Sequence, residues 1–158
     1  MNTFGIGREN LHGCISCGKC FANKDKKCAQ TDDKMNEYIE KLFGADGIIL
    51  GTPTYVANMT ANMKALIERA GLVSGANGNP LRRKVGAAVI AVRRAGATNV
   101  FSSLNFFFLI AEMIVVGSTY WNLGIGLAPG DVNKDKEGIR TFKNLGKNIA
   151  FVLQKLNS

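Results

Sequence analysis

The stretch Gly47-Ile48-Ile49-Leu50-Gly51-Thr52-Pro53-Thr54-Tyr55 decides the fold class of this chain. It begins as a short, continuous apolar run and ends at Thr52-Pro53. Residues 85–92, Val-Gly-Ala-Ala-Val-Ile-Ala-Val, form a second run of the same kind, which ends at Arg93-Arg94. Because such runs suit strands that are buried on both faces, we expect two parallel strands here, with a third over residues 113–116.

Segments with helical spacing of apolar residues lie between and after these strands. They cover residues 35–43, 60–70, 98–112 and 139–156. Strands that alternate with helices predict an α/β fold, in which helices cover both faces of a parallel sheet. Ligands of such sheets bind beyond the carboxyl ends of the strands. Three loops are therefore candidate binding loops, at residues 52–59, 93–98 and 118–121.

Composition indicates one folded domain over residues 1–158. The chain is 46% hydrophobic and 20% charged, which excludes a disordered protein, and its 18 glycines show no collagen period. The apolar stretch 104–117 contains Asn105 and Glu112 and is too short to cross a bilayer. Residues 1–4, Met-Asn-Thr-Phe, lack the features of a signal or transit peptide. We expect a cytoplasmic protein that does not bind membranes.

All the cysteines fall in one short segment, with the spacing C-x2-C-x2-C-x7-C. They are Cys14, Cys17, Cys20 and Cys28. Ferredoxin-type iron–sulfur segments share the first intervals, although here the fourth cysteine comes later and Ala29 follows it in place of proline. Zinc sites usually have two separated pairs of ligands, and His12 is the single histidine. A [4Fe–4S] cluster, unligated thiols and a zinc ion therefore remain as alternatives.

The loop at residues 52–59 has the chemistry of a flavin-binding loop. It joins a strand to a helix and presents hydroxyl groups, backbone N–H groups and the aromatic ring of Tyr55. These groups, with the partial positive charge of a helix N-terminus, can hold a flat heterocycle. Asn58 and Thr60 are both candidate helix caps. The alternative is an ordinary connection with a solvent-facing Tyr55.

Residues 45–55, followed by Met63-Lys64-Ala65-Leu66-Ile67-Glu68-Arg69, resemble the flavodoxin-like NADPH-dependent FMN reductases. With the cysteine segment in front, the chain is similar to the iron–sulfur flavoprotein branch of that superfamily. Residues 92–97 and 118–122 are also similar to loops of this group, so the likeness covers nearly the whole chain. It implies a flavodoxin-like three-layer sandwich with a parallel sheet.

The resemblance also implies the cofactor sites. FMN would lie across the strand ends, with its isoalloxazine ring along Thr52, Pro53, Thr54, Tyr55, Val56 and Asn58. A second wall would be formed by Arg93, Arg94, Gly96 and Ala97, whereas without the resemblance the two arginines are equally well explained as surface cations. A [4Fe–4S] cluster would be bound by Cys14, Cys17, Cys20 and Cys28. A dimer or tetramer would bring flavin and cluster close together.

The start of the chain departs from the pattern of this group. Flavodoxin-like chains open with a strand and a loop that binds the FMN phosphate, whereas residues 1–8 resemble the second strand of the group. We therefore expect an N-terminally truncated fold, with the cysteine loop 13–29 inserted after the first strand present. The first strand is central in the order 2-1-3-4-5, so its absence predicts an unpaired sheet edge.

The leading hypothesis is an FMN-dependent oxidoreductase without catalytic side chains. Electrons would pass between NAD(P)H or a reduced carrier protein, FMN, and a [4Fe–4S] cluster or a small-molecule acceptor. The alternatives are a plain NAD(P)H-dependent FMN reductase and an inactive flavoprotein fragment. The net charge of +8 motivates a nucleic-acid-binding module, but residues 82–84 are the one dense basic patch, so no nucleic-acid partner is expected. We read Gly5-Ile6-Gly7 and Gly124-Ile125-Gly126 as turns.

Overall fold

A computed structural model describes residues 2–158 of the chain. In chain order the helices and strands are α1 (Lys19–Asn23), α2 (Met35–Gly44), β1 (Gly47–Pro53), α3 (Ala61–Ala76), β2 (Val85–Val92), α4 (Ala97–Ile110), β3 (Ile114–Val115), β4 (Leu123–Ile125), the 3-10 helix η1 (Asp131–Lys134) and α5 (Lys136–Leu156). The helices and strands expected after residue 34 are present, together with α1, β4 and η1, which the sequence did not indicate.

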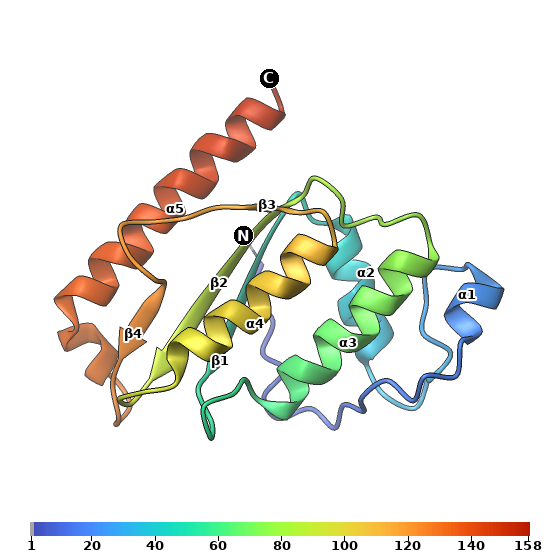
Figure 1. Ribbon diagram of the computed structural model, residues 1–158, viewed down its shortest axis with the longest axis horizontal. Helices are drawn as coiled ribbons and strands as arrows, with labels where there is room; N and C mark the ends of the chain where they lie inside the picture. The colour runs from blue at the N-terminus through green and yellow to red at the C-terminus, as the bar shows by residue number, and fades with distance from the viewer. Residues whose placement is uncertain (1) are drawn as a thin grey trace.

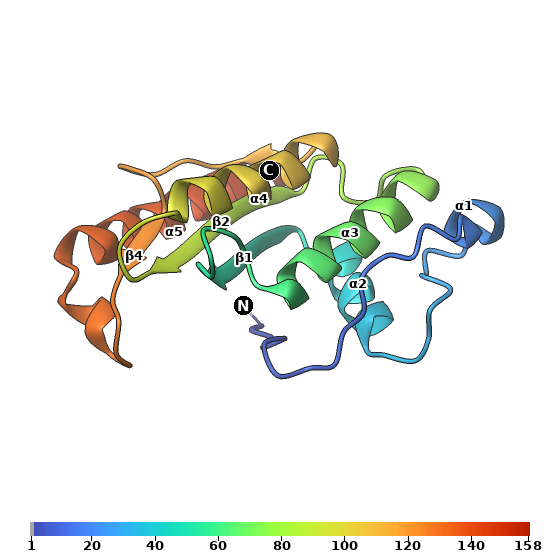
Figure 2. The same ribbon diagram turned by 60° about the horizontal axis from the view of Figure 1, so that its bottom comes forward.

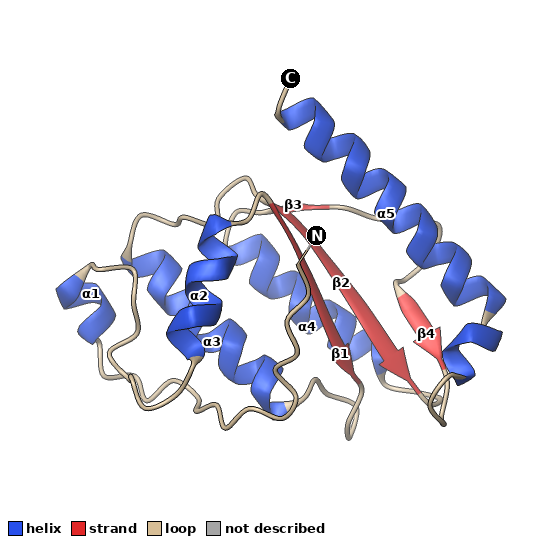
Figure 3. Ribbon diagram, turned by 180° about the vertical axis from the view of Figure 1, so that it is seen from behind, coloured by secondary structure: helices blue, strands red, loops and turns tan. Residues whose placement is uncertain are grey.

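The sheet is parallel throughout, and β2 is its central strand. One side of β2 pairs with β1 from Gly47 opposite Val85 to Pro53 opposite Ala91. The other side pairs with β3 near the start of β2 and with β4 near its end. All long strands therefore end at the same edge of the sheet, which Figure 3 shows at its lower side.

Alternate residues of the strands build two apolar cores on opposite faces of the sheet. Ile48, Leu50 and Ile90 pack with side chains of α2, α3 and α4, whereas Val85 and Ala87 pack with α5. Figures 1 and 3 show α4 in front of the sheet in one view and behind it in the other. The predicted α/β sandwich with a parallel sheet is confirmed.

Two sequence predictions about local structure are wrong. The strand expected before the cysteine loop is not formed: residues 7–9 form a turn, and the Ile6 and Glu9 carbonyl oxygens bind the Asn62 amide, at 2.7 and 2.8 Å, in place of a neighbouring strand. Gly124 lies in β4 and not in a turn. A Cβ atom at Gly124 would lie 2.8 Å from Val132 Cγ2 and 3.0 Å from Phe142 Cε2. This glycine is therefore required for close packing of β4.

β1 lies at an edge of the sheet, as expected. Among residues 2–158, β2 is the only strand with which it pairs. The side chain of Ile49, which points away from the α3 side, is 44% exposed. No helix of the described chain has the length and apolar character that a membrane span requires.

Candidate functional site

A tight turn follows β1 at the carboxyl edge of the sheet. Tyr55 and Asn58 exchange backbone hydrogen bonds of 2.8 and 2.9 Å, and Val56 and Ala57 between them have φ values of 50° and 56°. Left-handed backbone is unfavourable for a β-branched residue such as Val56. Tyr55 and Val56 are exposed at the tip of this turn, which protrudes beyond β1 in Figure 1.

The loop after β2 packs directly against this turn. Gly96 has a φ of 88°, and a Cβ atom there would lie 2.8 Å from Ala57 Cα and 2.9 Å from Ala57 Cβ. The Asn99 amide also donates a 2.8 Å hydrogen bond to the Ala57 carbonyl. The fold therefore brings two of the predicted binding loops together, at residues 52–59 and 93–98.

We expect Gly96→Ala to lower the free energy of unfolding by about 2 kcal/mol, because alanine is strained at this φ and collides with Ala57. Urea unfolding measures the change. Gly117→Ala is the matched control, since nothing lies within 4 Å of its added Cβ atom. The control should change the stability by less than about 0.5 kcal/mol. Equal effects of the two substitutions would contradict the packing described above.

The two threonines of the first loop have different environments. The buried Thr52 hydroxyl accepts a hydrogen bond from the Thr60 N–H at 3.2 Å and donates to the Pro53 carbonyl at 3.1 Å. Thr54 Oγ1 is buried and has no hydrogen-bond partner among the described residues. Because an unpartnered buried hydroxyl costs about 1–3 kcal/mol, Thr54 is suited to bind a polar atom of a ligand.

The second loop supplies positive charge and free N–H groups. Arg93 and Arg94 are exposed, and neither forms an ion pair with the residues that the structure describes. α4 begins at Ala97, and the first N–H groups of a helix have no partner within it. With Thr54 and the ring of Tyr55, these groups fit the polar edge and the flat face of a flavin.

The third predicted binding loop, residues 118–121, does not lie at the carboxyl edge. It leads into β4, whose first residue, Leu123, stands opposite Ile90, two residues before the end of β2. Asn144 and Asn148 of α5 hold this loop through hydrogen bonds to Thr119 and Gly117. The prediction was wrong because β3 and β4 together occupy one strand position, and the loop is the bulge between them.

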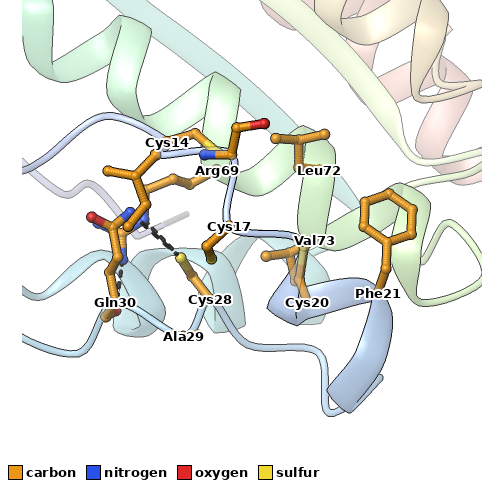
Figure 4. A pocket seen from close by; sticks show the side chains of 13 residues that line it. Cys14, Cys17, Cys20, Phe21, Cys28, Ala29, Gln30, Arg69, Leu72 and Val73 are labelled. Carbon is orange, nitrogen blue, oxygen red and sulfur yellow. Dashed lines mark hydrogen bonds between the residues drawn. The ribbon is translucent and has the colours of Figure 1, made fainter.

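The four cysteines line one pocket at the end of the molecule opposite α5 (Figures 2 and 4). Arg69, Leu72 and Val73 of α3 line its other side. All four thiols are free, and Cys28 is the buried one. Two of the sulfurs accept hydrogen bonds: Cys14 Sγ from the Ser16 N–H at 3.3 Å, and Cys28 Sγ from Arg69 Nε at 3.2 Å.

The pocket offers the donor types of an iron–sulfur core. Among residues 2–158, no three His, Cys, Asp or Glu side chains are grouped as a ready-made site for a metal ion. Four thiols around a pocket, with N–H groups directed at two sulfurs, are the donor set that a cluster requires. Burial raises the pKa of the Cys20 thiol, and the nearby sulfurs of Cys28 and Cys14 raise it further.

Positive charge surrounds the cysteine pocket. Four lysines of this segment are exposed, and none of them forms an ion pair with a described residue: Lys19, Lys24, Lys26 and Lys27. Such a surface offsets the negative charge of a cluster bound by four thiolates. The exposed side chains of Ile15 and Phe21 add apolar area to the same segment.

Sequence reasoning missed the residue that holds the cysteine loop to the core. Arg69 of α3 is 1% exposed and forms a 2.5 Å ion pair with Asp33. Burial alone would raise the pKa of Asp33, but hydrogen bonds from the His12 N–H and from Arg69 outweigh it and lower the pKa. The sequence does contain one indication of a buried role for Arg69: it is a cation among the apolar residues of a helix face, next to Ala70 and close to Leu66 and Val73.

The chain is similar to known proteins in sequence and in fold. A sequence model of the family described as NADPH-dependent FMN reductase matches residues 3–128. An iron–sulfur flavoprotein of Methanocaldococcus jannaschii is 39% identical over 156 residues, which span 94% of this chain and 78% of that protein. An iron–sulfur flavoprotein of Methanosarcina thermophila is 35% identical over 155 residues, spanning 97% of this chain and 78% of that protein.

Two solved structures share the fold. One is RosB with a bound 8-demethyl-8-formylriboflavin-5'-phosphate intermediate, with a TM-score of 0.62 and 24% identity over 82% of this chain and 55% of that chain. The other is a WrbA-like flavodoxin from Agrobacterium tumefaciens, with a TM-score of 0.51 and 19% identity over 69% of this chain and 71% of that chain. At these identities the likeness concerns the fold alone.

Proposed function

The chain belongs to the NADPH-dependent FMN reductase family, on its iron–sulfur flavoprotein branch, and from this premise we propose that it moves electrons between FMN and a [4Fe–4S] cluster. One observation carries the proposal: α3 connects the two candidate sites. The helix is capped by Thr60 directly after the loop of residues 52–59, and its residues Arg69 and Val73 line the cysteine pocket. At about 1.5 Å per residue, Arg69 lies about 13 Å along the helix from Thr60.

The residues at the carboxyl edge would bind and orient FMN. The Thr54 hydroxyl and the first N–H groups of α4 would bind polar atoms of the ring, and Tyr55 would cover a face. Arg93 and Arg94 would favour the anionic reduced form through their charge. Bound FMN supplies the chemistry, because a flavin accepts two electrons and can release them singly. No side chain is proposed as an acid, base or nucleophile.

At the other end of α3, Cys14, Cys17, Cys20 and Cys28 would hold the cluster. The lysine-rich surface around them supports a proposal about the electron donor or acceptor. An acidic one-electron carrier protein would be attracted to Lys19, Lys24, Lys26 and Lys27. Reduction by such a carrier should slow as salt is added, whereas reduction by NADPH or NADH directly at the flavin should respond much less.

The experiment that tests the proposal is an absorption spectrum with flavin, iron and sulfide assays on protein purified without oxygen. We expect flavin bands together with about four irons and four sulfides per chain. Flavin without iron would favour the second candidate, a plain FMN reductase whose cysteines are free thiols. Absence of flavin after addition of excess FMN would refute the oxidoreductase proposal for this polypeptide.

We further propose that the chain forms a homo-oligomer through the outer face of α4. Phe106, Leu109 and Ile110 are 68%, 60% and 81% exposed on this helix, which is far more apolar surface than solvent contact favours. The same face would be covered by its copy in a twofold dimer.

We expect Ile110→Lys to convert the oligomer to monomers at micromolar concentration, because the new charge would be buried at the interface. Light scattering coupled to gel filtration measures the mass. The control is Gln154→Lys, which adds the same charge to an exposed position of α5. An unchanged mass for both variants would exclude this face as the interface.

A further inference from the structure

Arg69 is a buried cation to which the proposed function assigns no role. It lies on the core side of α3, and both its side chain and that of Asp33 are fully buried. Burying a guanidinium group is costly unless its donors are all bound, so its partners indicate its purpose.

The partners of Arg69 all belong to the segment that carries the cysteines. One terminal nitrogen, Nη1, donates to Asp33 Oδ2 at 2.5 Å and to the His12 carbonyl at 3.2 Å. The other, Nη2, donates to the Gln30 carbonyl at 2.8 Å. Nε donates to Cys28 Sγ at 3.2 Å, as the dashed line in Figure 4 shows. One side chain therefore joins both ends of the cysteine loop to α3.

Cys28 is the most firmly held of the four cysteines. Asn36 binds its backbone on both sides, accepting from the Cys28 N–H at 2.7 Å and donating to the Cys28 carbonyl at 2.9 Å. Its sulfur receives the Arg69 Nε–H, and the Gln30 amide lies 3.9 Å away. Cys17, in contrast, is exposed on the loop. Hydrogen bonds within the polypeptide therefore hold both the backbone and the sulfur of Cys28 in place.

We propose that Arg69 is a positioning residue that fixes Cys28 as the anchored ligand of the cluster and raises the reduction potential of that cluster by its charge. The inference rests on the proposed function. The planar fork of arginine fits this role, because its donors bind several acceptors in fixed directions, which a lysine ammonium group does not.

The effect on the potential follows from electrostatics. One-electron reduction by dithionite adds a negative charge to the cluster, and a guanidinium beside Cys28 Sγ stabilises the reduced form more than the oxidised form. Asp33 offsets part of this charge, but it binds Nη1, whereas Nε faces the sulfur. Hydrogen bonds to ligand sulfurs act in the same direction.

The test compares Arg69→Met and Arg69→Lys with the wild type, each purified without oxygen with its flavin and cluster. We expect Arg69→Met to lose iron to a chelator about tenfold faster, as for other groups that orient metal ligands. Clusters that remain should have a lower midpoint potential, measured by dithionite titration with electron paramagnetic resonance. Arg69→Lys keeps the charge without the fork, so it should lose iron faster while its potential lies nearer the wild-type value.

Arg82→Met is the matched control, since Arg82 is exposed and pairs with Glu112 in another part of the chain. It should leave both measurements unchanged. If Arg69→Met does not fold, the Arg69→Lys variant decides the proposal. Wild-type iron retention and potential in the folded Arg69 variants would overturn the inference alone. A wild-type protein that binds flavin but no cluster would overturn the proposed function and this inference with it.

Discussion

Replacing Cys17 by alanine is expected to remove the iron–sulfur cluster while leaving the polypeptide folded and able to bind flavin. The Cys17 thiol is exposed and accepts no hydrogen bond from any residue between 2 and 158, so the substitution costs little packing. The loss of one of four thiolate ligands should, however, prevent a stable [4Fe–4S] cluster. Iron and sulfide per flavin should fall from about four to near zero.

The measurement combines iron and sulfide assays with the flavin absorbance of the same sample. Urea unfolding of the iron-free proteins should show that the two differ by less than about 0.5 kcal/mol. Thr31→Ala, an exposed change just beyond Cys28, is the control and should retain the cluster. Full iron and sulfide content in Cys17→Ala would show that Cys17 is not a ligand.

Asp33→Asn is expected to have the largest effect on stability. The substitution leaves the buried Arg69 guanidinium without its counter-charge, and breaking a buried ion pair in this way costs about 3–5 kcal/mol. The cysteine loop should loosen first, because Asp33 also accepts hydrogen bonds from the N–H groups of His12 and Met35. Urea unfolding at neutral pH measures the loss. The control is Asp32→Asn at the neighbouring exposed carboxylate, which should change the stability by less than about 0.5 kcal/mol.

The contribution of Asp33 to the free energy of unfolding should also depend on pH, and the direction follows from its pKa. The pKa of this carboxyl is lowered in the folded protein. A lowered pKa contributes stability that is present above the unfolded value of about 3.9 and is lost as the pH falls through the folded value. The free energies of unfolding of the wild type and Asp33→Asn should therefore differ less as the pH falls below about 4. If that difference stayed constant or widened on acidification, the result would contradict an ionised Asp33 paired with Arg69.

The sequence predicted the elements whose signals are local. The apolar runs at residues 47–50 and 85–92 became β1 and β2. Only β2 is largely buried on both faces, as such a run predicts, whereas Ile49 and Gly51 of β1 are exposed. The four expected helices were placed within a few residues, although α3 extends to Ala76, and the short helices α1 and η1 were not expected. The cysteine spacing identified the candidate ligands, and the loop at residues 52–59 was placed at the strand ends.

Local patterns misjudged β4 and the loop of residues 118–121. A strand of three residues with a central glycine resembles a turn, and only its packing against η1 and α5 explains Gly124. The position of the 118–121 loop depends on β3 and β4 sharing one side of β2. No run of neighbouring residues contains that information.

What the sequence by itself determined is the set of parts: parallel strands, covering helices, four cysteines and a hydroxyl-rich loop. Only the tertiary structure decided how they meet. Gly96 packs on Ala57. Arg69 contacts Cys28 and Asp33, which lie 41 and 36 residues before it in the chain. Periodicity and spacing report on neighbours along the chain, whereas these contacts exist because packing α3 and α4 against the sheet brings distant loops together. The physical reason is that a buried polar group must be hydrogen-bonded, and the fold determines which groups lie within reach of it.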